Sequence, residues 1–243
     1  MLRQINEEAA LKVQDYYLKN YFGKPNPDTK ALIDYCYAIV NKYGEASAAL
    51  SAEMYDAVAV LEGVVVPSAE IAEIASYGDV AKTVNGTLKV SENAELISNA
   101  VGRWVKMAGA DTTLKNAIRD GAQFAWVPSG ETCPFCLTLA SRGFQYASKK
   151  AIKGGHAEHI HANCDCQYTV RFDNKSTVAG YDPDKYYDMY HDADGRSPKD
   201  KINAMRREAY AEDKKTEGSD NSFCLTSAFY CVIACRCASG IAG

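Results

Sequence analysis

The sequence predicts a mainly α-helical fold that is followed by a small α+β module. Over the first 125 residues, apolar side chains recur at helical spacing between glycines, prolines and capping residues. A cysteine pair then stands at Cys133 and Cys136, a second cysteine cluster ends at Cys166, and residues 167–172 alternate like a strand. We therefore expect three parts: a helical domain over 1–125, a metal-stapled module over 126–175, and a C-terminal arm, helix and cysteine-rich apolar tail over 176–243.

The composition limits the classes of protein that need to be considered. With 243 residues and 47% hydrophobic side chains, the chain is long enough for one large or two small domains. Its net charge of −4 gives no electrostatic footprint for nonspecific nucleic-acid binding. The first eight residues lack the apolar run of a signal peptide, and nine cysteines is an odd count, so we expect synthesis in a reducing cytoplasm.

The first helices follow from capping and stop signals. Asn6 is a candidate N-cap for a helix that carries Leu11 and Tyr17 and stops near Gly23. Two prolines then predict a loop before Asp28, which can cap the next helix. Two helices are expected to follow. The first ends at Gly44 and the second at Gly63, with apolar residues at roughly helical spacing in both: Leu32, Cys36 and Ile39 in the first, Leu50, Met54, Val58 and Leu61 in the second.

The rest of the helical region is predicted from serine and aspartate caps. Ser68 is expected to start a short helix, and Ser91 to start a helix that runs toward Met107. Asp111 can restart that helix. Its last apolar face is expected to reach Ala125 and to lead the chain directly to the cysteine pair.

The cysteine clusters predict a zinc site. A gap of two residues lets both thiolates of the first pair face one tetrahedral ion, and a distant second cluster can close the loop. Histidines interleave with the second cluster, which favours a metal over buried cysteines or over disulfides in an exported protein. The candidate ligands outnumber the four positions of a structural zinc, and Cys164 and Cys166 compete for the last one. The candidates are Cys133, Cys136, His161, Cys164 and Cys166.

Short elements are expected around this site and after it. Gly143 is placed to end a short helix that begins at the cysteine pair, and residues 167–172 form a strand directly after Cys166. Ser197 caps a further helix, with proline at its first position. The tail over 222–243 is apolar but is interrupted by Arg236, so it does not look like a membrane anchor.

Three stretches of the sequence resemble the minor capsid proteins of tailed phages. They are residues 114–122, the run Glu131-Thr132-Cys133-Pro134-Phe135-Cys136-Leu137 with the residues up to Gly143, and His161-Ala162-Asn163-Cys164-Asp165-Cys166. Protein F of phage Mu typifies this family of head-morphogenesis proteins, which pairs a Cys-x-x-Cys knuckle with a later His-x-x-Cys-x-Cys. The nearest likeness is to a branch of minor structural proteins in phages of Gram-positive hosts. The similarity covers about residues 111–172.

The resemblance implies a structural, non-enzymatic role in the virion. Such MuF-like proteins are present in few copies, lie in the head interior or at the portal, and serve head assembly or genome delivery. The implied partners are the portal protein and other capsid proteins, with at most weak contact to packaged DNA and none to a membrane. Arg119, Asp120 and Arg142 match the family pattern. They are interpreted as surface charges or ion pairs that brace the knuckle, with a partner contact as the alternative.

Two other functions are weighed against the structural one. The stretch His156-Ala157-Glu158 next to a Cys-x-x-Cys pair is reminiscent of zinc deaminases, in which a glutamate moves a proton for a metal-bound water. Deaminases place this stretch before the cysteines, and surplus ligands here would close the site to substrate. A zinc module that binds nucleic acid is the third hypothesis, because four cations lie near the knuckle: Lys149, Lys150, Lys153 and Arg171.

Overall fold

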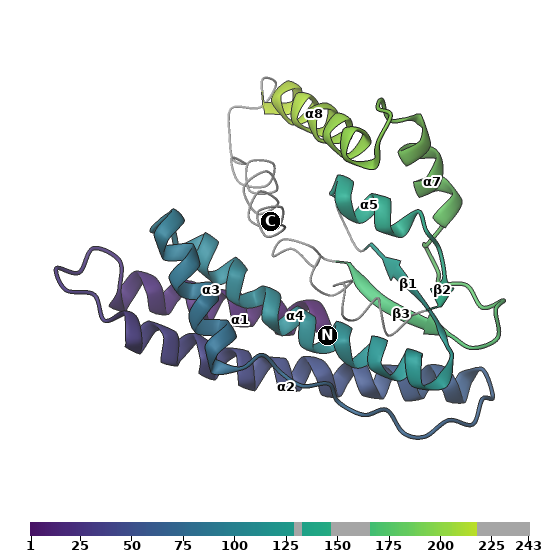
Figure 1. Cartoon of the computed structure of the whole chain (residues 1–243), viewed down its shortest axis with the longest axis horizontal. Helices are drawn as coiled ribbons and strands as arrows, with labels where there is room; N and C mark the ends of the chain where they lie inside the picture. The colour runs from purple at the N-terminus through teal and green to yellow at the C-terminus, as the bar shows by residue number, and fades with distance from the viewer. Residues whose placement is uncertain (129–132, 147–165, 218–243) are drawn as a thin grey trace. The chain divides into compact units, whose positions relative to one another are not determined.

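The computed structural model describes residues 1–128, 133–146 and 166–217, and it is mainly helical with a small sheet (Figure 1). The chain divides into two compact units. Among the described residues, the first unit holds Met1–Phe124, Tyr146 and Val170–Asn174, and the second holds the remainder. The expected domain boundaries near residues 125 and 175 stay predictions.

Four helices build the first unit around one apolar core. They are α1 (Leu2–Asn20), α2 (Thr29–Leu61), α3 (Tyr77–Val90) and α4 (Ala94–Asp120). The helix α4 packs against each of the other three. The core between them includes fully buried Val13, Tyr17, Leu32, Val40, Val80, Val84, Ile97, Val101 and Val105. The helical character expected for this region is therefore confirmed.

The helix starts are set by side chains that accept backbone N–H groups. Asp28 caps α2 as expected, because its Oδ1 accepts the Ala31 N–H at 2.9 Å. Ser76 forms a capping box at the start of α3, a helix that the sequence did not lead us to expect. Two expected caps are wrong. The N-cap of α1 is Met1 instead of Asn6, and Asn93 caps α4, whereas Ser91 ends α3.

Gly44 does not end a helix, and the two helices expected between Asp28 and Gly63 are one. Glycine at this point of α2 allows a close approach, since a Cβ there would lie 3.2 Å from Cγ2 of Ile74. Gly63 does end α2, with φ +68° in the left-handed region. Likewise, Asp111 does not start a new helix, because α4 continues through this residue without a break.

The helix expected to start at Ser68 is absent. Residues 64–76 run extended instead, between the end of α2 and the cap of α3. The backbone N–H and C=O groups of this segment bond to side chains of α2 and α4 instead of to one another. Local caps favoured a helix, but these longer-range bonds favour the extended form.

The contact between α2 and α4 is built from small residues. A Cβ at Gly109 of α4 would lie 2.7 Å from Oγ of both Ser47 and Ser51, and 3.2 Å from the carbonyl oxygen of Ser47. Both serines are almost fully buried in α2. Only glycine at position 109 lets the two helices approach this closely.

The remaining elements are β1 (Gln123–Val127), α5 (Pro134–Ala140), β2 (Gln145–Tyr146), β3 (Gln167–Arg171), α7 (Pro183–Asp192) and α8 (Pro198–Glu217). The strands form one sheet in the order β2-β1-β3. The strand after Cys166 and the helix after Ser197 are confirmed, and Ser197 Oγ accepts the Asp200 N–H at 3.2 Å. Ala125 lies in β1 and not in a helix, because Gly121 adopts φ +69° and ends α4.

Short apolar clusters hold α5, α7 and α8 together. Ala140 of α5 packs with Ala125 and Tyr181, and the Tyr181 hydroxyl donates to the Ala140 carbonyl at 2.7 Å. Leu137 of α5 packs with Met205 of α8. Among the described residues, none of the helices has the length and apolar character needed to cross a membrane.

Replacing Gly109 with alanine should destabilise the helical unit. The new methyl group would meet two serine oxygens and a backbone oxygen, so we expect the free energy of unfolding in urea to fall by about 1–3 kcal/mol. Gly86 in α3 is the matched control, because nothing lies within 4 Å of a Cβ there. Gly86→Ala should raise the free energy of unfolding by up to about 1 kcal/mol through helix propensity. Equal effects of the two substitutions would contradict the close contact.

Candidate functional site

The cysteine pair lies at the start of α5. Cys133 is the N-cap residue, and its Sγ accepts the Cys136 N–H at 3.4 Å. Pro134 occupies the first helical turn, where its missing N–H has no bond to lose. Cys136 is only 1% exposed, whereas Cys133 is half-buried, so one side chain of the pair lies in the interior and the other lies near the surface. The expected short helix from this pair is thus confirmed, and Gly143 follows it with φ +62°.

The structure places three of the five candidate ligands. Cys166 is half-buried and directly precedes β3. His161 and Cys164 lie outside the described residues, as do His156 and Glu158. Within the described part of the chain, no group of three or more His, Cys, Asp or Glu side chains has the arrangement of a metal site. The full ligand set therefore stays a prediction.

The donor chemistry of the placed residues fits zinc. Thiol sulfurs are preferred ligands of zinc, and an N–H that points at sulfur stabilises the negative charge of a thiolate. The contrast with Cys36 in the helical core is informative. Cys36 is fully buried among apolar side chains, and this burial raises the pKa of its thiol to about 12. Such a thiol is a core residue and not a metal ligand.

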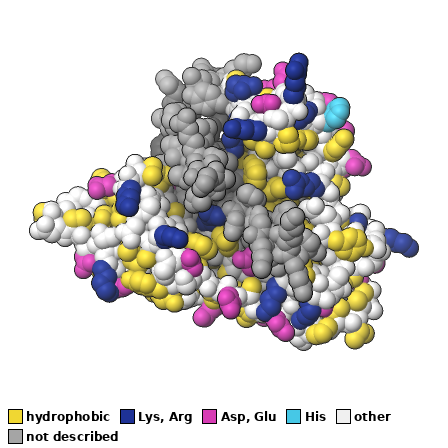
Figure 2. Space-filling view, viewed as in Figure 1, with side chains coloured by type: hydrophobic (Ala, Val, Ile, Leu, Met, Phe, Trp, Pro, Cys, Tyr) yellow, Lys and Arg dark blue, Asp and Glu magenta, His cyan; other side chains and the backbone are white. Residues whose placement is uncertain are grey.

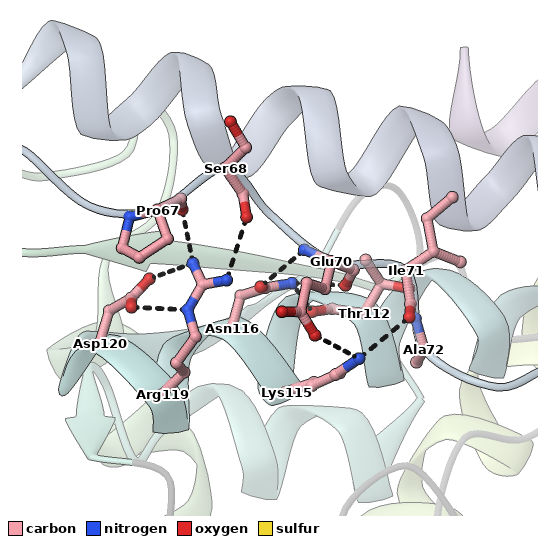
Figure 3. Close-up of polar contacts among 10 residues, drawn as sticks. All are labelled: Pro67, Ser68, Glu70, Ile71, Ala72, Thr112, Lys115, Asn116, Arg119 and Asp120. Carbon is pink, nitrogen blue, oxygen red and sulfur yellow. Dashed lines mark hydrogen bonds and ion pairs between the residues drawn. The ribbon is translucent and has the colours of Figure 1, made fainter.

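Apart from the cysteines, a cluster of polar side chains on α4 anchors the extended segment 64–76 (Figure 3). The Asn116 amide binds both backbone groups of Glu70: its oxygen accepts the Glu70 N–H at 2.9 Å, and its nitrogen donates to the Glu70 carbonyl at 2.8 Å. One turn earlier, Thr112 accepts the Ala72 N–H at 3.1 Å. Lys115 donates to the Ile71 carbonyl at 3.2 Å and pairs with the Glu70 carboxylate at 2.9 Å.

Arg119 completes this cluster. Its guanidinium donates to the carbonyls of Pro67 and Ser68 at 2.6 and 3.0 Å. It also forms a two-point ion pair with Asp120 at 2.7 and 2.8 Å, and the Tyr55 hydroxyl donates to the same carboxylate at 2.9 Å. Arg119 and Asp120 thus brace the helical unit and its extended segment, and no contact of theirs in the described residues involves the cysteine pair.

The ion pair changes the acidity of its neighbours. The Arg119 guanidinium, followed by the Tyr55 hydroxyl, holds the pKa of the Asp120 carboxyl below its ordinary value of 3.8, against the opposing effect of burial. Burial, followed by the bond to Asp120, raises the pKa of Tyr55. The carboxylate therefore stays charged and the phenol neutral at physiological pH.

Sequence reasoning identified Arg119 and Asp120 but missed Thr112, Asn116 and Lys115. A signal was present, because polar residues at positions 112, 116 and 119 recur at helical spacing on one face of α4. A proline-containing stretch lies between α2 and α3. Neither feature alone predicts that the helix face binds the stretch.

Comparison with protein families gives a match over most of the chain. The model of the family described as VG15 protein matches residues 1–193, which is most of the chain. This chain belongs to the VG15 protein family. Members are phage or viral gene products, so the expectation of a phage protein is confirmed at this level, while the MuF-like minor capsid type stays a prediction. No curated protein and no solved structure matches the chain.

The VG15 match covers the cysteine pair as well as the polar cluster on α4. The Cys-x-x-Cys pair, Cys166 and the anchored segment all lie within residues 1–193, whereas the cysteine-rich tail over 222–243 lies beyond the match and outside the described residues. The family therefore includes the helical unit and the cysteine module together. It assigns no role to the tail.

Removing the Asn116 amide should loosen the anchored segment. Asn116→Ala leaves the N–H and C=O of Glu70 without their partners, so the free energy of unfolding should fall by about 1–3 kcal/mol. Hydrogen exchange at the Glu70 amide should become faster. Glu70→Ala is the matched control, since it keeps these backbone bonds and loses only a surface ion pair worth about 0–1 kcal/mol. A larger loss in Glu70→Ala than in Asn116→Ala would contradict this account.

The Asp120 carboxylate should make stability depend on pH. Its pKa is lowered in the folded state, so its favourable contribution is present above the unfolded pKa near 3.8 and is lost as pH falls through the folded pKa. Asp120→Asn should therefore unfold more easily at pH 7, and below about pH 4 its free energy of unfolding should fall less steeply than that of the wild type. Tyr55→Phe, which removes one donor, should lie between. Identical slopes in wild type and Asp120→Asn would refute the assignment.

Proposed function

We propose that this VG15 family member is a minor structural component of a phage head, without enzymatic activity, and that a structural zinc ion holds its cysteine module. The support comes from two sources. The family consists of phage or viral gene products. The cysteine pair lies at the start of α5, with Cys133 as the N-cap residue and Cys136 buried, and a Cys-x-x-Cys spacing suits two ligands of one zinc ion.

The proposed zinc site takes its ligands from both cysteine clusters. Cys133 and Cys136 would hold the ion from the start of α5, and His161 with either Cys164 or Cys166 would complete four ligands. When bound, zinc supplies a rigid cross-link and makes its binding energy part of the folding energy. Since Cys166 directly precedes β3, a bond to this residue would tie β3 to α5. Four protein ligands leave no open position for a substrate.

The proposed setting is the head interior or the portal region of the virion, after synthesis in the host cytoplasm. The partners would be the portal protein and other capsid proteins, with only weak contact to packaged DNA. In this proposal the helical unit provides the surface that contacts these partners. The metal cross-links the cysteine module. The alternatives of a zinc hydrolase and of a nucleic-acid-binding module stay hypotheses, because His156, Glu158 and the three lysines that suggested them lie outside the described residues.

The zinc site is tested by metal content. Wild-type protein, purified without added metal, should carry about one zinc per chain. Cys133→Ser and Cys136→Ser should each lose most of it, and a strong chelator should lower the melting temperature of the wild type. Cys36→Ala is the matched control: it leaves a cavity in the helical core but should keep the zinc. Metal-free wild-type protein, or equal zinc loss in Cys36→Ala, would sink the zinc assignment.

The structural role is tested in the phage itself. A nonsense mutation in the gene should give defective heads or heads that fail to deliver DNA, and mass spectrometry should find the protein in purified wild-type particles in few copies. Complementation with Cys133→Ser should fail, whereas Cys36→Ala should restore infectious particles. A protein that is abundant in infected cells and absent from particles would refute the virion assignment.

A further inference from the structure

The second half of α2 turns its large apolar side chains outward. Met54 is 42% exposed, Val60 78% and Leu61 84%, and Val65 just beyond the helix is 99% exposed. Leu50 is half-buried and Ala57 is exposed on the same side. Figure 2 shows hydrophobic side chains along the lower edge, where Figure 1 places α2 and the segment that follows it. We call the surface formed by Leu50, Met54, Ala57, Val60, Leu61 and Val65 the α2 ridge.

The opposite face of the same helix is buried and consists mostly of small residues. Ser47, Ser51 and Ala59 pack inward, and the close approach to α4 at Gly109 has no room for larger side chains. An amphipathic helix ordinarily buries its large apolar stripe. In this half of α2 Tyr55 is the large side chain on the inner face, and Met54, Val60 and Leu61 remain exposed on the outer one. Exposed apolar patches of this kind mark interaction surfaces.

The stretch of chain that forms the ridge is acidic. From Lys42 to Lys82 the chain has no intervening Lys, Arg or His. The same stretch contains seven acidic residues: Glu45, Glu53, Asp56, Glu62, Glu70, Glu73 and Asp79. Glu45 and Glu53 are exposed on α2, and Lys115 offsets only Glu70. The ridge therefore has an acidic border from its own stretch of chain, while Lys115 and Arg119 of α4 bind residues 67–71.

We propose that the α2 ridge docks an amphipathic helix of another protein, whose apolar stripe is flanked by Lys and Arg. The spacing of Leu50, Met54, Ala57 and Leu61 is four, three and four residues, which is the seam of a helix pair. The acidic border fixes the charge of the partner helix by complementarity. A second copy of this ridge would bring like charges together, and the anionic surface of a membrane would repel it.

This inference goes beyond the proposed zinc and head functions and depends on neither. It is tested with the full-length protein and a labelled synthetic helix of a few heptads that carries Leu at the seam and Lys at the flanks. The control peptide has the same seam with Glu at the flanks. Fluorescence anisotropy should give at least ~10-fold tighter binding of the Lys-flanked helix, and added salt should reduce that difference.

Variants locate the binding surface. Leu61→Lys and Glu53→Lys should each weaken binding of the Lys-flanked helix several-fold, and Glu53→Lys should also improve binding of the Glu-flanked one. Leu11→Lys is the matched control, because Leu11 is a 63% exposed leucine on α1. Since all three positions are exposed, an unchanged urea midpoint should confirm that each variant folds.

Several results would overturn the proposal. One is equal affinity for the two peptides. Another is a loss of affinity in Leu11→Lys as large as in Leu61→Lys, which would indicate general attraction to an acidic protein. A third is sedimentation of the wild type as a dimer that Leu61→Lys converts to a monomer, which would assign the ridge to a second copy. Failure of the zinc or virion tests would leave this proposal untouched.

Discussion

The close approach of α2 to α4 is the constraint on which the rest of the helical unit depends. Two serines of α2 lie against Gly109 with no space for a Cβ, and this contact decides which face of α2 is inside. Helices that approach closely gain dispersion contacts along their whole length, but they must use small side chains to do so. In the second half of α2, Met54, Val60 and Leu61 are then left on the outer side. One packing choice thus accounts for both the buried serines and the exposed ridge.

The same contact explains why the segment after α2 is held by polar bonds. With α2 and α4 side by side, the chain must pass from the end of one helix back along both before α3 can begin. Residues 64–76 bury few side chains on the way, so their backbone groups need partners. Asn116 and Arg119 supply several of them, and the Asp120 carboxylate orients the guanidinium. The bonds are made to the backbone, so they fix the path of the segment and tolerate change in its sequence.

The helical character and several helix ends could be predicted from local signals. Asp28, Gly63, Ser197 and the Cys133 start of α5 all act within a few residues of the backbone groups that they satisfy, so the sequence alone is sufficient there. Gly44 was misread, since its reason is a contact with Ile74 thirty residues away. Ser68 was misread for the same cause, because the bonds that keep the segment extended come from α2 and α4.

The candidate site shows the same difference between residues that local signals predict and residues that only long-range structure can place. The thiol pair could be found by spacing, since Cys133 and Cys136 belong to one helical turn. Closing the ligand set requires residues of the second cluster, and only long-range structure can choose between Cys164 and Cys166. Around α5 the described residues form two apolar clusters: Ala125, Ala140 and Tyr181 are one, and Leu137, Ala193 and Met205 are another. A small module buries less apolar surface per residue than a large domain, so a metal cross-link at α5 would add folding energy to these contacts.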